Sequence, residues 1–298
     1  MSSLAKVAAQ CPGLIANLRY FKKFHRFGNF KGDVDTMSLF VDYVFRVMLE
    51  NGGNQRWALR ADKYAVRAEV ASIVGDKYLI PLYGHWDNPE DIDFDSLPDS
   101  FVLKTNNGCG TNIIVHDKST LDRKAAVKQL KKSLEFPYPQ FTGQLHYSLI
   151  KPCVIAEKLM VEKGHKSLTD YKFYCVNGEP VRIYTFMERD EVHHFDFKVM
   201  AFDPQWNEHP EALTEKYRAP EGAIKAPAQL GEMMDIARKL SADDEFVRVD
   251  LYLIDGRIYF GELTYTPDSA FAAAFVANGM NPMLDKIKAD RRAGKTRG

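Results

Sequence analysis

The chain has 298 residues, and its 40 lysines and arginines balance 40 aspartates and glutamates, so its formal net charge is zero. A content of 45% hydrophobic and 27% charged residues is that of an ordinary globular protein, and the length suffices for about two domains or one domain divided into lobes. The balanced charge argues against non-specific nucleic-acid binding, which needs a positive excess. A local basic pocket for one anionic ligand is compatible with these values.

Sequence patterns exclude some further classes of protein. No run of about 18 apolar residues is present, so no membrane-spanning helix is predicted. The N-terminal stretch lacks a small-residue cleavage pattern, so no signal peptide is predicted. The cysteines are far apart and form no C-x-x-C pair, which argues against a disulfide framework or a zinc site. These features together predict a cytoplasmic protein.

Helices dominate the predictions for the N-terminal part of the chain. Apolar residues on one stripe predict a helix over residues 35–49. Asp62 is a suitable N-cap for a second helix over residues 62–74, and residues 78–82 are a candidate strand. Residues 84–100 are acidic and rich in turn-forming residues, and we interpret them as a linker that follows an N-terminal lobe.

Strands, two more helices and two hairpins are predicted for the rest of the chain. We expect single strands at 101–104, 112–116, 154–157 and 195–202, a helix at 119–134 capped by Ser119 or Thr120, and a helix at 228–240. Two hairpins are expected, 170–176 with 180–187 around Asn177-Gly178, and 246–254 with 257–263 around Asp255-Gly256. The basic stretch 286–298 is interpreted as a solvated, partly disordered tail.

Lys104 and the turn that follows it form the first candidate site. The turn, residues 105–111, contains Gly108 and Gly110, and glycine lets backbone N–H groups approach an anion closely. A lysine at the end of the preceding strand would point into the same space. The segment matches neither a P-loop nor the G-x-G-x-x-G dinucleotide fingerprint, so an ordinary hairpin turn is the alternative.

The second hairpin carries the stronger signal. Asp250 and Glu262 can lie opposite each other on one face, and Arg248 falls on that face two residues before Asp250. Two adjacent carboxylates repel unless a cation lies between them, and Mg²⁺ binds oxygen ligands of this kind together with phosphate oxygens and water. The alternative is a surface salt-bridge cluster, which the apolar neighbours on both strands disfavour because buried unpaired charges are costly.

Two further charged clusters complete a recognisable order along the chain. Lys63 follows Asp62 and precedes Arg67 by about one helical turn, and Lys172 shares a strand face with Asp170. Together with Lys104 and the second hairpin, these clusters resemble the ATP-grasp superfamily, most closely its TupA-like branch, named for teichuronopeptide biosynthesis. The segments that carry the resemblance are "ADKYAVRAEV", "LPDSFVLKTNNGCGTNIIV", "IAEKLM", "DYKFYCVNGEP" and "FVRVDLYLIDGRIYFGELTYTP".

The resemblance covers most of residues 55–285 and implies a fold. It implies an α+β ATP-grasp fold in which two α+β lobes clasp ATP, preceded by a small N-terminal lobe that is mostly helical or αβ. The implied divisions are 1–98 for the N-terminal lobe, 99–160 for a lid lobe with the phosphate loop, 161–285 for a large lobe with the metal site, and 286–298 for the basic tail.

The resemblance also implies an ATP site. Lys63, Lys104 and Lys172 resemble lysines that bind nucleotide phosphates. The flexible loop over the phosphates would contain Asn106, Gly108, Gly110 and Thr111. The hinge whose backbone pairs with adenine would comprise Glu157, Lys158 and Leu159, and Glu162 is a candidate for the ribose hydroxyls.

A metal site and a catalytic pair are implied as well. Asp250, Glu262 and Thr264 would bind Mg²⁺, or alternatively Mn²⁺. Thr264 stands where many family members have asparagine, which puts a second metal ion in doubt. Arg248 resembles the arginine that stabilises the transferred phosphate, and with Lys172 it forms the candidate catalytic pair.

The implied activity is ATP-dependent carboxylate–amine ligation through an acyl phosphate, with release of ADP and phosphate. The branch name suggests amide formation between a uronic-acid carboxyl of a cell-surface or capsule polysaccharide, or its sugar precursor, and an amino acid or amine. The alternatives are a phosphotransferase acting on a sugar or small molecule, a glycosyltransferase of polysaccharide biosynthesis, and a nucleotide-binding protein without turnover. No nucleic-acid partner is expected, and the sequence does not indicate an oligomeric state.

Overall fold

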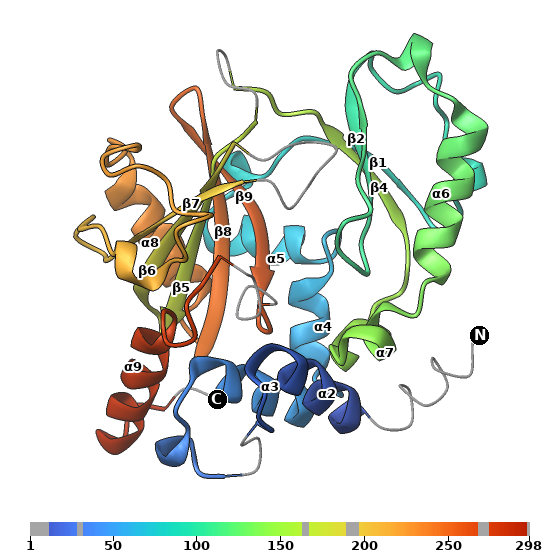
Figure 1. The fold of residues 1–298 in the computed structure, drawn as a ribbon. Coiled ribbons are helices and arrows are strands. Elements are labelled where there is room, and N and C mark those ends of the chain that lie inside the picture. Colours follow the sequence, from blue (N-terminus) through green and yellow to red (C-terminus); the bar gives the residue numbers. More distant parts are fainter. Residues whose placement is uncertain (1–11, 29–31, 163–166, 189–196, 268–273, 297–298) are drawn as a thin grey trace. The chain divides into compact units, whose positions relative to one another are not determined.

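The computed structural model describes residues 12–28, 32–162, 167–188, 197–267 and 274–296 (Figure 1). These residues fall into two compact units. Unit 1 takes its residues from 1–16, 49–69 and 79–160, and unit 2 takes its residues from 17–48, 70–78 and 161–298.

Unit 1 is built on a four-stranded antiparallel sheet in the order β1-β4-β2-β3. The strands are β1 (Leu82–Trp86), β2 (Phe101–Thr105), β3 (Ile113–Val115) and β4 (Val154–Lys158). Its helices are α4 (Gln55–Ala61), the start of α5 (Val66–Ile73), α6 (Arg123–Glu135) and α7 (Tyr138–Thr142).

The core of unit 1 lies between α6 and the sheet. Alternate residues of β2 and β4 point to the same face, and on that face Phe101, Leu103 and Ala156 are buried. Leu130 of α6 packs into the same cluster, and Figure 1 shows the helix running alongside the strands. The opposite face is therefore left to carry polar side chains, among them Lys104 and Glu157.

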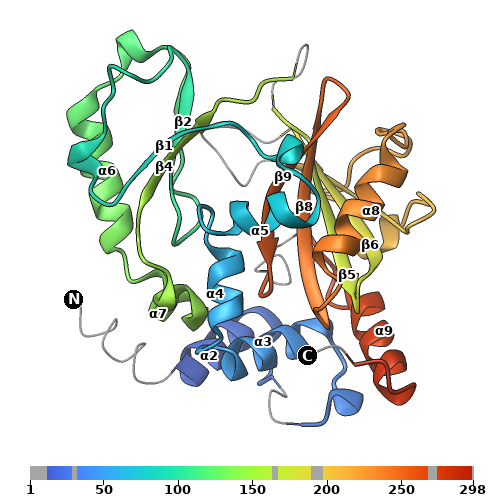
Figure 2. The ribbon, with the colours of Figure 1, turned by 180° about the vertical axis from the view of Figure 1, so that it is seen from behind.

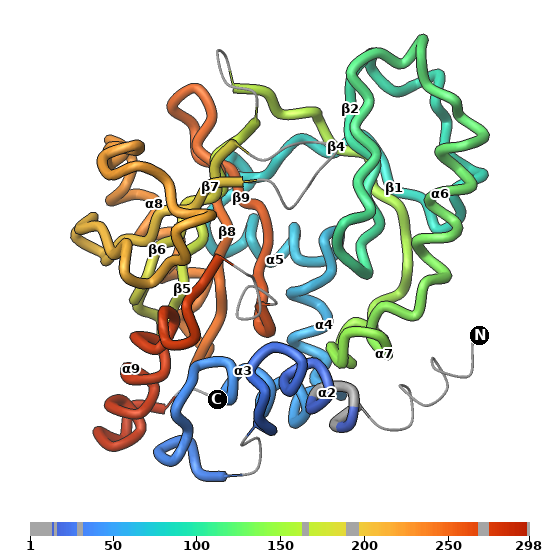
Figure 3. The backbone as a smooth tube through the Cα atoms, in the orientation of Figure 1, coloured from blue at the N-terminus to red at the C-terminus, as the bar shows by residue number. Residues whose placement is uncertain are grey.

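Unit 2 contains a five-stranded antiparallel sheet in the order β7-β6-β5-β8-β9 (Figure 3). The strands are β5 (Asp170–Val176), β6 (Glu179–Met187), β7 (Lys198–Phe202), β8 (Phe246–Ile254) and β9 (Arg257–Thr264). Its helices are most of α2 (Pro12–Phe24) and of α3 (Phe40–Glu50), with α8 (Leu230–Leu240) and α9 (Asn281–Arg292). Helices α8 and α9 both contact β5 and β6, and Figure 2 shows them against the sheet.

Both predicted hairpins are confirmed, with the two-residue turns that their sequences favour. Asn177 and Gly178 have φ angles of 50° and 81°, and Asp255 and Gly256 have φ angles of 49° and 76°. Positive φ at both central residues is the type I′ geometry, whose twist matches that of the flanking strands. Local turn chemistry thus fixes the register of the strand pairs that carry the candidate site.

The predicted helix over residues 35–49 is wrong at its N-terminal end. Asp33 caps a short 3₁₀ turn at Val34–Thr36, and Met37 is extended, so the helix cannot begin at residue 35. Helix α3 begins at Phe40, where the Asp42 carboxylate accepts a 3.3 Å hydrogen bond from the backbone N–H of Leu39.

The predicted helix over residues 62–74 is interrupted at its start. Helix α4 ends at Ala61, and the Asp62 carboxylate accepts hydrogen bonds from the backbone N–H groups of Tyr64 and Ala65 before α5 begins at Val66. Asp62 therefore caps the turn between α4 and α5. It lies four residues before the first residue of α5, whereas the sequence predicts it as the N-cap of that helix.

The predicted strand at 78–82 and the linker at 84–100 are also corrected. Strand β1 covers Leu82–Trp86, and the chain beyond it buries Ile92, Phe94 and Leu97 in the core of unit 1. Helix α6 begins later than predicted, because Asp122 accepts the N–H of Ala125 as its N-cap. Short 3₁₀ helices account for Asp76–Tyr78, Pro89–Asp91, Lys118–Thr120, Leu145–Leu149 and Pro210–Ala212.

The basic C-terminal stretch is not a solvated tail over its first residues. Helix α9 extends to Arg292, and it buries Met283, Leu284 and Ile287. Arg291 and Arg292 form ion pairs with Glu245 and Asp35 at 2.7 Å. Of the predicted strand 195–202, residues 195 and 196 lie outside the described residues, and β7 covers Lys198–Phe202. The divisions at residues 98, 160 and 285 stay predictions.

Candidate active site

Three adjacent strands of the unit 2 sheet, β5, β8 and β9, bring the predicted charged residues together on one face. In the strand register, Asp250 of β8 lies between Lys172 of β5 and Glu262 of β9. One step along the same face, Arg248 pairs with Thr264 of β9. The prediction that Asp250, Glu262 and Arg248 share a face of the hairpin is therefore confirmed, and β5 adds a lysine to it.

Arg248 holds both carboxylates of this cluster. Its Nε and Nη2 atoms donate to the two oxygens of Asp250 at 2.6 and 2.7 Å, and Nη2 also donates to Glu262 Oε1 at 2.6 Å. Burial alone would lower the pKa of Arg248, but the charges of Asp250, Tyr174 and Glu262 raise it well above its ordinary value. The guanidinium is therefore a permanent cation in this site.

Lys172 adds a second cation to the same carboxylate. Its Nζ atom lies 2.5 Å from Asp250 Oδ2 and 3.6 Å from Asp170 Oδ2. The Lys172 and Asp250 side chains are only 11% and 4% exposed, whereas the Glu262 side chain is 40% exposed. Asp250 is thus the buried centre of the cluster, and Glu262 is the carboxylate open to solvent.

The cluster as a whole has an excess of negative charge that suits a metal cation. Asp170, Asp250 and Glu262 outnumber Lys172 and Arg248, and the Thr264 hydroxyl donates to Glu262 Oε1 at 3.0 Å. Two carboxylates and a hydroxyl form an all-oxygen donor set, which fits Mg²⁺. Within the described ranges, no group of three or more His, Cys, Asp or Glu side chains could hold a metal ion. Mg²⁺ usually takes only one or two carboxylates and completes its shell with phosphate and water.

A β-bulge at Gly261 sets how Glu262 faces Asp250. Asp250 pairs with Glu262 and the next residue, Leu251, pairs with Phe260, so Gly261 is the extra residue on β9. A Cβ at Gly261 would lie 3.1 Å from the carbonyl oxygen of Asp250. Glycine therefore permits the close approach of the two strands beside the carboxylates.

In unit 1, a second arrangement of charges surrounds Glu157. Lys104 Nζ lies 2.8 Å from one Glu157 oxygen, and Arg67 Nη1 lies 2.9 Å from the other. Arg67 also donates from Nη2 to the carbonyl oxygen of Ile80 at 2.7 Å. Burial lowers the pKa of Arg67, and the charge of Glu157 opposes that shift. Glu157 thereby fixes the position of Lys104 at the end of β2.

The loop after Lys104 is held at several points. The Thr105 and Thr111 hydroxyls lie 2.8 Å apart across its base, and Lys63 Nζ donates to the carbonyl oxygen of Gly108. Gly110 has a φ of 70°, a left-handed conformation that favours glycine. The predicted site residues Lys104, Gly108 and Thr111 therefore lie on one segment of unit 1, and Lys63 contacts that segment through Gly108.

Asn106 is placed differently from the rest of this loop. It is 1% exposed, and its side-chain amide donates to Asp62 Oδ1 at 2.9 Å and to the Lys151 carbonyl at 3.0 Å. Its side-chain oxygen accepts the N–H of Cys153 at 2.7 Å. The side chain is engaged by the protein at both ends, so it braces the base of the loop.

The remaining predicted residues lie at the end of β4 and beyond it. Lys158 has an exposed side chain, and its N–H donates to the carbonyl oxygen of Pro81 at 2.9 Å. Leu159 follows directly and is half-buried. Glu162 is half-buried in unit 2, where burial first and the Glu162 charge second raise the pKa of Tyr171 to about 12. The nucleotide contacts implied for these residues stay predictions.

Several residues that position the site residues are not among those that the sequence predicts. Asp62 and Arg67 were noted only for helix capping and spacing, yet they hold Asn106 and Glu157. Tyr252 lies directly across from Asp170 on the site face, and the Asp170 charge, with burial, raises the pKa of Tyr252 well above its ordinary value. The bulge at Gly261 could have been predicted from the sequence, because an isolated glycine inside a strand pattern indicates a bulge.

A family model described as TupA-like ATPgrasp matches residues 44–286. The chain belongs to the TupA-like ATP-grasp family. The α+β fold with two antiparallel sheets is the ATP-grasp fold, and the family assignment makes this protein an ATP-dependent ligase. It also supports carboxylate–amine ligation as the class of reaction.

Solved structures similar to this TupA-like protein include three ligases or synthetases. D-alanine–D-alanine ligase from Bacillus anthracis is 17% identical, with 80% of this chain and 70% of that chain covered and a TM-score of 0.44. D-cycloserine synthetase DcsG is 15% identical, with coverage of 85% and 78% and a TM-score of 0.45. The ATP-grasp ligase PsnB, complexed with a minimal precursor, Mg and ADP, is 12% identical, with coverage of 84% and 66% and a TM-score of 0.43.

A search of curated proteins gave no match. In the part of the chain that the structure describes, no helix combines the length and the apolar character needed to cross a membrane.

Proposed function

We propose that this protein joins a carboxylate to an amine through an acyl phosphate formed from ATP. The observation that carries the proposal is the in-register set of Lys172, Asp250 and Glu262, with Arg248 donating to both carboxylates. This set supplies cations for phosphate oxygens and carboxylates for Mg²⁺ on one sheet face. Lys63 and Lys104 of unit 1 are proposed to bind nucleotide phosphates.

The chemistry of the first step explains why the chain needs these cations. A carboxylate oxygen of the substrate attacks the γ-phosphorus, and the bond from that phosphorus to the β–γ bridging oxygen breaks, which releases ADP. Both reactants are anionic, so positioned cations must offset their repulsion and stabilise the charge of the transition state. Arg248 and Lys172 are proposed for this role, since each is buried and held in place by Asp250.

The second step needs no nucleophile from the protein. The substrate amine attacks the acyl carbon, the bond from that carbon to the phosphate oxygen breaks, and inorganic phosphate leaves as the nitrogen loses a proton. An acyl phosphate hydrolyses readily, so water must be kept away from it. We propose that the loop 106–111 provides this shelter.

A metal ion fits the proposal through the donors described above. Asp250, Glu262 and the Thr264 hydroxyl would hold Mg²⁺, or Mn²⁺ in its place. The ion would supply charge neutralisation at the phosphate oxygens. Glu262 and Thr264 share one contact at 3.0 Å, which places the hydroxyl beside the solvent-exposed carboxylate.

We extend the proposal to the substrates and the setting. The carboxylate is proposed to be a uronic acid of a cell-surface polysaccharide or of its sugar precursor, and the acceptor an amino acid or amine. The TupA-like family match supports this choice, because the branch is named for teichuronopeptide biosynthesis. We place the reaction in the cytoplasm, where ATP is available.

The test is a screen for ADP release with Mg²⁺ across uronic acids and amino acids. We expect ADP and free phosphate only when a carboxylate and an amine are both present, and a hydroxamate when hydroxylamine replaces the amine. Phosphate retained on the acceptor would show a phosphotransferase instead. Consumption of a sugar nucleotide with ATP untouched would show a glycosyltransferase.

A further inference from the structure

The outer face of α6 in unit 1 carries a row of lysines. Lys124, Lys128 and Lys132 are exposed and follow one another at four-residue spacing, so adjacent members lie about one helical turn apart. Ala126 and Leu130 are buried on the opposite side of the helix. The row therefore runs along about 12 Å of helix surface that the sheet does not cover.

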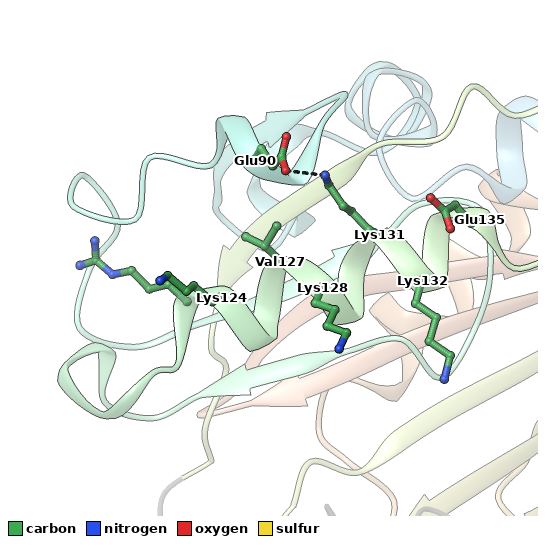
Figure 4. A pocket seen from close by; sticks show the side chains of 8 residues that line it. Glu90, Lys124, Val127, Lys128, Lys131, Lys132 and Glu135 are labelled. Atoms are coloured by element: carbon green, nitrogen blue, oxygen red, sulfur yellow. Dashed lines mark hydrogen bonds and ion pairs between the residues drawn. The ribbon is translucent and has the colours of Figure 1, made fainter.

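These three lysines differ from the other cations of α6. Arg123 pairs with Asp95 at 2.7 Å, and Lys131 pairs with Glu90 at 2.5 Å. In the described ranges, no ion pair or hydrogen bond is formed by the side chains of Lys124, Lys128 and Lys132. Figure 4 shows Lys131 turned towards Glu90, while Lys128 and Lys132 extend away from it.

The cations line an open groove along the helix. Its volume is about 760 Å³, and five of its eight lining residues are basic while two are acidic. The eight are Glu90, Arg123, Lys124, Val127, Lys128, Lys131, Lys132 and Glu135 (Figure 4). The groove is thus a local positive patch on a chain whose net charge is zero.

Helix stability does not explain this placement of charge. Like charges four residues apart on a helix repel each other. The first turn of α6 holds Arg123 and Lys124 and no acidic residue, although the positive end of a helix favours acidic side chains there. Asp122 caps the start of the helix, but repulsion within the row does not stabilise α6, so the fold itself gives no reason for the row.

An aromatic pair continues the row at the C-terminal end of the helix. Phe136 follows Lys132 by the same four residues and is 45% exposed. Phe141 of α7 is 67% exposed, and the centroids of the two rings lie 5.7 Å apart. Exposed rings beside cations suit a ligand that presents both apolar C–H faces and negative charge.

We propose that Lys124, Lys128 and Lys132, with Phe136 and Phe141, bind an extended acidic glycan through its carboxylates and the C–H faces of its sugars. The choice of a glycan rests on the proposed function. The surface would hold a polymeric carboxylate substrate along unit 1, outside the residues that carry the chemistry. An acidic polypeptide and a nucleic acid are the competing partners, and the experiment separates them.

The experiment measures binding of a fluorescent polygalacturonate oligomer to the full chain by anisotropy, without ATP. We expect the affinity to fall as salt is raised, since ionic contacts are screened. Changing Lys124, Lys128 and Lys132 together to Glu should weaken binding at least about tenfold, or about 1.4 kcal/mol. The control changes Lys216, Lys225 and Lys239 to Glu, which alters the net charge equally on unit 2 and should preserve binding. Equal losses in both triple variants, or no binding by the wild type, would overturn the proposal.

A second variant identifies the class of partner. Phe136→Ala should weaken the binding of polygalacturonate and leave the binding of polyglutamate unchanged, because only the sugar offers C–H faces to the ring. Equal effects on both polymers, or tighter binding of single-stranded DNA than of polygalacturonate, would overturn the assignment to a glycan.

Separate assays distinguish this proposal from the proposed function. The Lys-to-Glu triple variant of α6 should release ADP at the wild-type rate with small soluble substrates. If ADP release is normal and glycan binding is absent, only the docking surface fails. If glycan binding is confirmed and no substrate pair supports ADP release, only the proposed reaction fails.

Discussion

The side-chain amide of Asn106 donates a 2.9 Å hydrogen bond to Oδ1 of Asp62, across 44 positions of sequence. The same Asp62 oxygen accepts the N–H groups of Tyr64 and Ala65, so one carboxylate ties the break between α4 and α5 to the end of β2. Lys63 lies in the break between α4 and α5, directly after Asp62, and its side chain donates to the carbonyl oxygen of Gly108. The contact therefore positions two of the proposed phosphate-binding segments relative to each other within unit 1.

We predict that Asn106→Ala weakens both the fold of unit 1 and ATP binding. Loss of the amide leaves the Cys153 N–H and the Lys151 carbonyl without their partner, and the free energy of unfolding should fall by about 2–4 kcal/mol. The KM for ATP should rise more than kcat falls, because the loop is misplaced and the reacting groups are intact. Urea unfolding and steady-state kinetics measure the two effects.

Asn88→Ala is the matched control for this change. Asn88 is an exposed asparagine that caps a 3₁₀ turn through the N–H of Glu90. Its loss should lower stability by about 1 kcal/mol or less and leave the KM for ATP unchanged. An unchanged KM for ATP in Asn106→Ala would show that the hydrogen bonds of the Asn106 side chain contribute to stability alone.

Removing a charged side chain of the proposed site, whether it belongs to unit 1 or to unit 2, should abolish most ATP turnover. We expect Lys104→Ala, Arg248→Ala and Glu262→Ala each to lower ATP turnover at least about 100-fold, or about 2.7 kcal/mol. ADP release under saturating Mg²⁺ measures the effect, and circular dichroism checks folding. Near-wild-type turnover in all three variants would contradict the site assignment.

Exposed cations of the same types provide controls for that series. Lys151 is 79% exposed and pairs with Asp87, and Arg238 is 42% exposed and pairs with Glu179. Alanine at either position should leave turnover within about twofold of wild type, since surface pairs contribute little. Arg248→Lys tests the fork geometry, because lysine keeps the charge and loses the donors that reach Asp250 and Glu262 together.

Gly261→Ala should disturb the metal-binding carboxylates without removing either of them. The new Cβ would lie 3.1 Å from the Asp250 carbonyl oxygen, so the bulge must shift and Glu262 with it. We expect a higher Mg²⁺ concentration for half-maximal turnover and a stability loss of about 1–3 kcal/mol. Gly231→Ala in α8 is the control, because its Cβ would meet nothing within 4 Å and alanine favours the helix. An unchanged Mg²⁺ requirement in Gly261→Ala would contradict the role of the bulge.

His146 makes stability depend on pH. It is 1% exposed between the rings of Trp57 and Tyr147, and burial lowers its pKa to about 4. Because the unfolded chain binds this proton near pH 6.5, the stability that depends on neutral His146 is complete above that pH. It is lost as the pH falls towards 4, up to about 3 kcal/mol.

The measurement compares wild type with His146→Leu by urea unfolding at several pH values from 7.5 down to 4.5. Leucine cannot titrate, so the unfolding free energy of the variant should rise relative to that of the wild type as the pH falls below 6.5. A difference in unfolding free energy that stays constant over this range would contradict the prediction.

The sequence predicted the unit 2 site more fully than the unit 1 site, for a physical reason. In unit 2, two-residue turns set the register of adjacent strands, so the facing of Asp250 and Glu262 follows from local patterns. In unit 1, Asp62 meets Asn106 and Arg67 meets Glu157 through side chains far apart in sequence. Such pairs depend on tertiary packing, which local periodicity does not encode.

The C-terminal stretch shows how charge can hide a helix. Met283, Leu284 and Ile287 follow helical spacing and are buried, and the predicted tail, residues 286–298, begins inside the helix that they form. The apolar stripe is narrow, and the arginines beyond it form ion pairs with Glu245 and Asp35 within unit 2. Here the period of the few apolar residues was the better signal.

The charges on β5 have a consequence for how unit 2 folds. Strands β5, β6 and β7 precede β8 and β9 in the chain, so β5 is an open edge until β8 pairs with it. An unpaired edge strand is a template for pairing with other chains, and charged side chains on it discourage such pairing. During synthesis, the charges of Asp170 and Lys172 would discourage the pairing of β5 with other chains. This lasts until β8 pairs with β5 and brings Asp250 to Lys172. Lys172, which is proposed for catalysis, would thus also protect the nascent chain from aggregation.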